Sequence, residues 1–248
     1  MDKYWLERTE LLIKETGLEK LHNATVLVVG LGGVGSFAAE FLARSGVGSI
    51  TIVDGDTVDI TNVNRQLPAL HSTVGMHKVD VVGDRLLDIN PKLNLKKINE
   101  FLNPERMAEI LDSEKFDYIL DCIDSVTPKT SLIIAARRRK IKIVSCMGAG
   151  GKIDPSKVLV RDIHKTQHCH LARQIRKRLK KEKIDKGARC VFSDEIQDED
   201  SLKMTDGSNY KRSFYGTISY MPAIFGLYAA SEVINHLLKN TNLDDAEL

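Results

Sequence analysis

The sequence predicts an α/β fold in which a Rossmann-like, mostly parallel sheet is flanked by helices and extended by antiparallel strands. Short apolar runs, of the kind buried on both faces of a parallel sheet, alternate along the chain with segments of helical periodicity. The first run, 25–30, leads through a glycine-rich turn into a helix, as a βαβ unit requires. We expect a single domain over 1–248, with a first part at about 20–150 and a second part at about 151–240.

The first part contains regularly spaced elements. Strands are predicted at 25–30, 49–53, 93–98, 118–123 and 141–146, and helices at 37–43, 79–89, 104–111 and 128–140. Proline marks two of the boundaries, because Asn90-Pro91 ends one helix and Pro128 lies near the first turn of another. Strands that alternate with helices in this way form a parallel sheet joined by helical crossovers.

The second part begins with a change of pattern. The turn sequence Asp154-Pro155-Ser156-Lys157 predicts that 152–153 pairs antiparallel with a strand at 158–160, which makes the sheet mixed. The rest of the chain is predicted as an amphipathic helix at 171–183, an acidic loop at 194–206, an apolar helix at 221–238 and a frayed tail at 240–248.

The composition is that of a globular protein, with 42% hydrophobic and 28% charged residues. The most apolar stretch, 218–238, is interrupted by Pro222 and Glu232, so no membrane span is predicted. The N-terminus lacks the order of a secretory signal, and we therefore expect a cytoplasmic protein. The four cysteines form no C-x-x-C pair, which argues against both a disulfide framework and a zinc site.

The glycine-rich turn predicts a nucleotide site. It contains Gly30, Gly32, Gly33 and Gly35, follows a strand and opens a helix, where glycines let the backbone approach a phosphate. Asp54 ends the next strand and is placed to accept hydrogen bonds from ribose hydroxyls. These features alone favour an ordinary NAD-binding dehydrogenase.

The segment after Asp54 shifts the interpretation towards ATP. It carries polar and cationic side chains at Asp56, Asn62, Arg65, Gln66 and Lys78. A dehydrogenase needs no cations just beyond its ribose carboxylate, whereas an adenylating enzyme needs them to offset charge on the α-phosphate and the departing pyrophosphate. Simple solvation remains an alternative for Arg65 or Lys78 taken singly.

These motifs, together with Asp121-Cys122-Ile123-Asp124, resemble those of the ubiquitin-activating-enzyme-like superfamily, in the same order over about 8–151. The resemblance implies that Asp54 holds the ribose, that Asn62 and Arg65 contact phosphates and that Lys78 neutralises the α/β-phosphate region. It implies a magnesium ion on Asp124, with Arg65, Lys78 and Asp124 as the catalytic set. It also implies a homodimer in which Arg8 reaches the γ-phosphate across the interface.

Within this superfamily, sulfur-carrier activators usually carry two C-x-x-C pairs that bind zinc, and this sequence has none. The segments 124–129, 148–155, 171–173 and 190–195 instead resemble the threonylcarbamoyladenosine dehydratases. That resemblance implies ATP-dependent cyclisation of the threonylcarbamoyl group on the adenosine beside a tRNA anticodon, through adenylation of the threonyl carboxylate. The ring form of the product, an alkali cation and sulfur-relay protein partners stay open.

The predicted helix at 171–183 is the candidate tRNA-binding element. Apolar residues occupy one stripe of it, and its other positions carry the cations Arg173, Arg176, Lys177, Arg178, Lys180, Lys181 and Lys183. With 137–140 they could hold RNA phosphates electrostatically, although a solvated face is the alternative. Phe214, Tyr215 and Tyr220 are expected in the core or at a dimer contact.

Several alternatives remain at this point. Cys190 is either a covalent nucleophile or a packing residue, and 148–151 is either a tight turn or a backbone nest at the floor of the site. The other candidate functions are an adenylyltransferase acting on the C-terminus of a ubiquitin-like sulfur carrier, an NAD-dependent oxidoreductase and a non-catalytic RNA-binding module.

Overall fold

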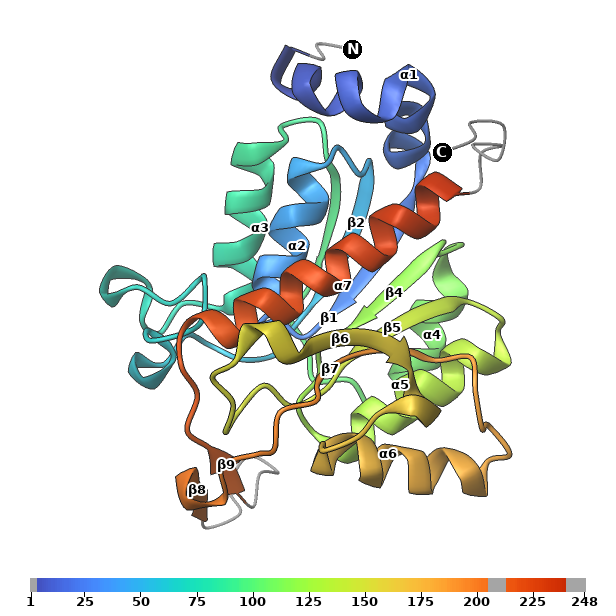
Figure 1. Ribbon diagram of the computed structural model, residues 1–248. Helices are drawn as coiled ribbons and strands as arrows, with labels where there is room; N and C mark the ends of the chain where they lie inside the picture. The colour runs from blue at the N-terminus through green and yellow to red at the C-terminus, as the bar shows by residue number, and fades with distance from the viewer. Residues whose placement is uncertain (1–3, 205–212, 240–248) are drawn as a thin grey trace.

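A computed structural model describes residues 4–204 and 213–239 and has a seven-stranded sheet at its centre (Figure 1). The strand order is β3-β2-β1-β4-β5-β7-β6, and only β6 runs antiparallel to its neighbour. The strands are β1 (Thr25–Val29), β2 (Ser49–Val53), β3 (Asn94–Ile98), β4 (Tyr118–Asp121), β5 (Lys142–Cys146), β6 (Val158–Asp162) and β7 (Arg189–Ser193). The predicted fold class is confirmed.

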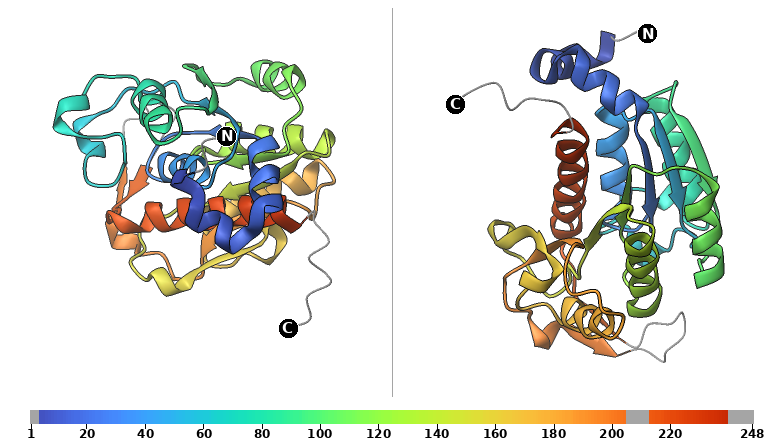
Figure 2. Two further views of the ribbon diagram at one scale, coloured as in Figure 1. Left: turned by 90° about the horizontal axis from the view of Figure 1, so that it is seen from above. Right: turned by 90° about the vertical axis from the view of Figure 1, so that its right-hand side faces the viewer.

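Helices cover both faces of the sheet (Figure 2). One face carries α2 (Gly35–Arg44), α3 (Lys78–Ile89) and α7 (Tyr220–Lys239), and the other carries α4 (Pro104–Ser113), α5 (Val126–Arg138) and α6 (His170–Lys181). Strand residues alternate between the two faces, so Val26 and Val28 of β1 join one core while Leu27 and Val29 join the other. Burial on both sides explains why the central strands are continuous apolar runs.

Short elements complete the chain. The 3-10 helices are η1 (Tyr4–Leu6), η2 (Ile60–Asn62), η3 (His71–Thr73), η4 (Pro155–Lys157), η5 (Ile163–Lys165) and η6 (Glu199–Ser201). A small hairpin-like sheet pairs β8 (Leu202–Met204) antiparallel with β9 (Ser213–Tyr215). No helix in the described ranges is long and apolar enough to cross a membrane.

The pairing predicted after the 154–157 turn is wrong. The antiparallel partner of β6 is β7, a strand that was not predicted, rather than 152–153. Lys152 is buried, and its ammonium donates to the carbonyl oxygens of Ser193 at 2.8 Å and Glu195 at 2.6 Å. Lys152 therefore contacts the end of β7, and 152–153 does not pair with β6. The acidic loop predicted at 194–206 is also partly wrong, because it contains η6 and β8.

The N-terminal helix α1 (Glu7–Asn23) was not predicted and lies apart from the nucleotide turn. It sits at the amino end of β1, beside the end of α7, and is kinked at Lys14, whose φ is 64° (Figures 1 and 2). Leu11 and Leu12 are 70% and 81% exposed, so the first half of this helix has no buried apolar stripe that would reveal it as amphipathic. The tail predicted at 240–248 falls outside the described residues.

Candidate nucleotide site

The glycine turn is formed by backbone packed against backbone. Gly30 adopts φ +92°, and a Cβ there would lie 2.9 Å from the carbonyl oxygen of Cys122. A Cβ on Gly35 would lie 1.7 Å from the carbonyl oxygen of Gly30, and one on Gly33 would lie 2.9 Å from Pro222. These contacts leave no room for side chains at the three positions. The first turn of α2 follows directly, so the positive end of the helix dipole lies at the glycine turn.

Asp54 ties the end of β2 to this turn. Its Oδ2 accepts the Leu31 N–H at 2.6 Å, and its Oδ1 accepts the Asp56 N–H at 2.8 Å. Burial raises the pKa of Asp54, while the Leu31 hydrogen bond and the charge of Lys78 oppose the rise. Each carboxylate oxygen keeps a further lone pair, so the group can still accept a ribose hydroxyl.

Lys78 is buried at the start of α3, with 5% of its surface exposed. Its ammonium lies 3.0 Å from Asp56 Oδ2, and its backbone N–H donates to the Asp56 carbonyl at 3.0 Å. An ammonium carries three donors, so the ion pair holds Lys78 in place and leaves further donors for a phosphate.

Arg65 lies on the other side of the glycine turn, after η2. Its Nη1 donates to the Thr61 carbonyl at 2.8 Å and to Asn64 Oδ1 at 2.9 Å. Burial lowers the pKa of Arg65, and the charge of Asp124 opposes this, so the two groups are electrostatic neighbours. Asn62 is buried and stabilises η2, because its Oδ1 accepts the Asp59 N–H at 3.2 Å.

Gln66 presents an unsatisfied acceptor beside the glycines. Its Oε1 is buried and has no hydrogen-bond donor within the described parts of the chain. The Nε2 atom of the same side chain is the nearest atom to the position that a Cβ on Gly32 would take, at 3.6 Å. A buried acceptor without a donor is unusual, and this one lies beside the predicted phosphate turn.

Asp124 is the exposed carboxylate of the turn that follows β4. Across the described ranges no three His, Cys, Asp or Glu side chains cluster as metal ligands. Magnesium in nucleotide sites is commonly held by one or two carboxylates, substrate phosphates and water. Asp124 fits such a site, in which the phosphates supply the remaining oxygen ligands.

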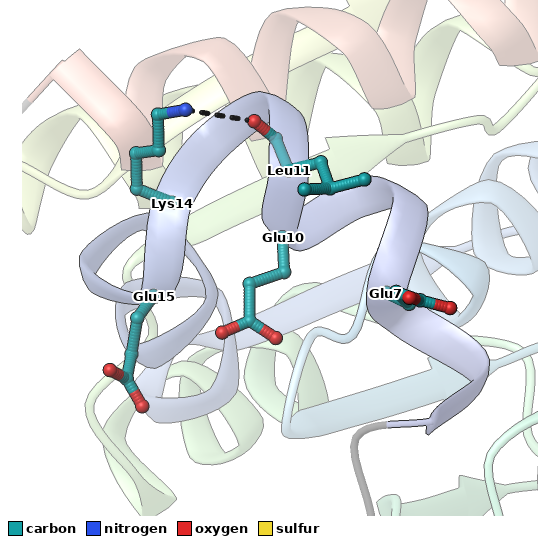
Figure 3. Close-up of a pocket in the computed structure, with 5 residues that line it drawn as sticks. All are labelled: Glu7, Glu10, Leu11, Lys14 and Glu15. Carbon is teal, nitrogen blue, oxygen red and sulfur yellow. Dashed lines mark hydrogen bonds between the residues drawn. The ribbon is translucent and has the colours of Figure 1, made fainter.

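Arg8 does not join the other predicted residues. It is exposed on α1, at the amino ends of the strands, whereas the glycine turn lies at their carboxyl ends. A hollow of about 290 Å³ beside it is lined by Glu7, Glu10, Leu11, Lys14 and Glu15 (Figure 3). Three carboxylates make that hollow unsuitable for a phosphate.

The cations of α6 fall into two groups. Arg176 donates to the Thr166 carbonyl at 2.9 Å and to the Thr166 hydroxyl, and Arg178 donates to Thr127 Oγ1 at 2.9 Å. Arg173, Lys177, Lys180 and Lys181 are exposed, as is Arg178, whose guanidinium is held by Thr127. The 137–140 cluster is less available, because Arg138 pairs with Glu182 and Arg139 with Asp112.

Three features that the sequence left open have a definite structural setting. Cys190 is fully buried, and burial raises the pKa of its thiol well above the ordinary value, which favours packing over a nucleophilic role. In the 148–151 segment, Gly150 and Gly151 form a turn in which Gly151 adopts φ +68°, and this favours the tight-turn interpretation. Phe214 and Tyr220 are 49% and 39% exposed, which excludes the core alternative for both and leaves the dimer contact as the prediction.

A buried ion pair beneath the site was not recognised in the sequence. Asp121 ends β4 and Lys129 lies in the first half of α5, with Asp121 Oδ2 2.8 Å from Lys129 Nζ and both side chains fully buried. The spacing of eight residues across a strand, a turn and a helix is not a helical or strand period. No local sequence signal could therefore have paired them.

A sequence profile of the ThiF family matches residues 6–247 of the chain. The chain belongs to the ThiF family. This assignment confirms the superfamily resemblance and agrees with the site geometry, since the turn, Asp54, Lys78 and Arg65 surround one place at the carboxyl ends of β1 and β2.

Among ThiF-family and related proteins, the chain is similar over almost its whole length to tRNA threonylcarbamoyladenosine dehydratases. It is 42% identical to that of Bacillus subtilis, over 95% of each chain. The crystal structure of the Escherichia coli dehydratase in complex with ATP superposes with a TM-score of 0.87 at 37% identity, covering 97% of both chains. The molybdopterin-synthase adenylyltransferase of Salmonella typhimurium is 36% identical over 52% of this chain and 51% of its own.

Proposed function

We propose that this chain is an ATP-dependent tRNA threonylcarbamoyladenosine dehydratase. The observation that carries the proposal is the gathering of Arg65, Lys78 and Asp54 around a glycine turn, in a chain similar to such dehydratases over 95% of its length. The tRNA substrate makes the cytoplasm the expected compartment.

In the proposed reaction a carboxylate oxygen of the threonyl group attacks the α-phosphorus of ATP, and pyrophosphate leaves. The nitrogen or oxygen of the modification itself then attacks the acyl carbon of this acyl-adenylate, which closes the ring, releases AMP and gives up the proton of the attacking group to solvent. The carboxylate oxygen that departs with AMP accounts for the water lost from the nucleoside. No protein nucleophile is needed, which agrees with the burial of Cys190.

Each site residue has a role in this scheme. Asp54 accepts the ribose hydroxyls, and the positive end of the α2 dipole faces the phosphates. Arg65 and Lys78 offset the charge that develops as pyrophosphate leaves, and both are held in place before the substrate binds. Asp124 would hold magnesium, which supplies further charge neutralisation at the phosphates.

The decisive experiment is mass spectrometry of nucleosides from threonylcarbamoyladenosine-bearing tRNA after incubation with the protein, ATP and Mg²⁺. We expect the modified nucleoside to lose the mass of one water, with release of AMP and pyrophosphate. An ATP analogue with a methylene bridge between the α- and β-phosphorus should give no product. An unchanged nucleoside, together with pyrophosphate exchange that requires a sulfur-carrier protein, would instead support the adenylyltransferase alternative.

ATP should bind in preference to NAD, because Arg65 and Lys78 supply cations for a triphosphate next to the ribose carboxylate. Calorimetric titration of the purified protein with each nucleotide, in the presence of Mg²⁺, measures both affinities. Tight NAD binding without measurable ATP binding would remove the adenylation proposal and restore the oxidoreductase.

We further propose that the active form is a homodimer in which Arg8 completes the partner's site. Two observations support it: Arg8 lies at the end of its own chain's sheet opposite the glycine turn, and Leu11 and Leu12 next to it are strongly exposed. Exposed apolar clusters of this kind commonly mark association surfaces.

Mixing two inactive variants tests the shared site. Arg8→Ala and Arg65→Ala protomers should each be inactive alone, whereas their heterodimer contains one site with both arginines. An equimolar mixture should therefore recover up to about a quarter of wild-type activity, the statistical share of intact sites in a two-fold dimer. Full activity of Arg8→Ala alone, or no recovery after subunit exchange, would contradict a site shared between protomers.

A further inference from the structure

The buried pair Asp121–Lys129 lies directly behind the turn that carries Asp124. Three donors converge on the Asp121 carboxylate: Oδ2 accepts Lys129 Nζ at 2.8 Å and Ser145 Oγ at 2.6 Å, and Oδ1 accepts the Ile123 N–H at 3.1 Å. Lys129 Nζ also donates to the Asp121 carbonyl at 3.3 Å. All three side chains are fully buried.

Burial of two charges needs a compensating reason. Removing a carboxylate and an ammonium from water is costly, and an ion pair in the interior often stabilises a fold no better than apolar residues of the same size. Burial raises the pKa of Asp121, and the Lys129 charge opposes that rise, so the carboxyl group lies in an environment unfavourable to its charge. A role in geometry accounts for the pair better than a role in stability.

The geometry in question is that of the β4–α5 turn. The Ile123 N–H bond to Asp121 fixes the turn one residue before Asp124. The same turn forms the wall of the glycine loop, because a Cβ on Gly30 would lie 2.9 Å from the Cys122 carbonyl oxygen and 3.3 Å from Ile123 N. The Cys122 N–H in turn donates to the Val29 carbonyl at 2.9 Å, at the end of β1. One buried carboxylate thus orients both the proposed magnesium ligand and the phosphate turn.

We propose that Asp121, Lys129 and Ser145 form a positioning network that aims Asp124 at the nucleotide-bound magnesium ion. The inference rests on the proposed function, because Asp124 has a magnesium ligand's role only in an ATP site. The network touches neither substrate nor metal, and it acts through the Ile123 N–H. Partners behind a metal ligand commonly contribute about 10-fold to 100-fold in metal affinity.

The test measures how much Mg²⁺ strengthens binding of the α,β-methylene ATP analogue, as the ratio of dissociation constants without and with Mg²⁺ in calorimetry. The charge-neutral double variant Asp121→Leu/Lys129→Met should fold and lower this ratio by about 10-fold or more. Adding Asp124→Ala to it should change the ratio little further, because the network acts through Asp124. Ser145→Ala, which keeps both charges and is the variant least prone to misfold, should lower the ratio about fivefold, the scale of one hydrogen bond.

A matched control is the pair Arg189–Glu232, which makes two hydrogen bonds of 2.7 and 3.0 Å between β7 and α7. Its double variant Arg189→Met/Glu232→Leu should keep the wild-type ratio. Two outcomes would show that the positioning role is wrong while the proposed ATP site stands. In the first, Asp124→Ala lowers the ratio but the network double variant and Ser145→Ala leave it unchanged. In the second, the fold-change from the network variants multiplies with the fold-change from Asp124→Ala. If Asp124→Ala itself changes nothing, both the magnesium role of Asp124 and the network's purpose are overturned.

Discussion

Replacing Arg65 by alanine is expected to lower the rate of the ATP-dependent dehydration by about 100-fold or more, the scale on which a preorganised charge stabilises a transition state. The guanidinium is held by Thr61 and Asn64, so it is in place before the reaction begins. Its partial burial away from water strengthens its interaction with the α-phosphate charge. Single-turnover assays with saturating tRNA would isolate this chemical step from binding.

The matched control is Arg106→Ala, which removes an exposed arginine of α4. This arginine pairs with Glu109 on the same helix and with Glu100, which precedes the helix. It should retain wild-type turnover, because its ion pairs are exposed. Both variants should keep the wild-type melting transition. Near-normal turnover of Arg65→Ala would mean that the phosphate site has been placed wrongly.

The second large effect is expected from α6. Replacing four of its exposed cations, Arg173, Lys177, Lys180 and Lys181, by alanine should weaken tRNA binding at least about 10-fold and flatten its salt dependence, because each phosphate contact releases counterions. Arg176 is left unchanged, since its bond to Thr166 makes it part of the fold. The slope of log affinity against log salt should fall by about one for each RNA phosphate that α6 no longer neutralises.

Filter binding at several salt concentrations measures this slope, and ATP calorimetry on the same variant should show unchanged affinity. Alanine at four exposed lysines elsewhere, Lys92, Lys96, Lys115 and Lys157, is the charge-matched control and should affect tRNA binding less. Wild-type affinity and slope in the α6 variant would show that α6 is only a solvated face.

Most of the sheet could be predicted because its strands are buried on both sides. The runs at β2 and β4 contain no polar position that water must reach, so their composition alone distinguishes them from loops. The glycine turn was equally clear, since its conformations are restricted by backbone contacts that exclude side chains. Asp54 and Lys78 followed from their positions directly after β2 and at the start of α3.

The structural features that the sequence did not predict depend on contacts between segments that are far apart in the sequence. The strand β6 pairs with β7, some 30 residues further along the chain, and Lys152 donates to carbonyls at the end of that same strand. Asp121 and Lys129 form an ion pair in the interior of the fold, and no local periodicity of the sequence indicates that they pair. The helix α1 carries exposed leucines, so the helical periodicity of apolar residues that identifies an amphipathic helix is weak there.

The last helix of the chain sets the order in which this protein can fold during synthesis. Met221, Phe225, Ala229 and Val233 of α7 are fully buried in the core on the α2 side of the sheet, and Pro222 packs against Gly33 of the phosphate turn. While the ribosome is still making the earlier residues, that face of β4, β5 and β7 lacks the cover of α7, and Gly33 lacks its contact with Pro222. A nascent chain that stops short of α7 should therefore expose apolar surface and depend on chaperones. The nucleotide turn, although it is encoded near the start, takes its final form only when residues 220–239 have left the exit tunnel.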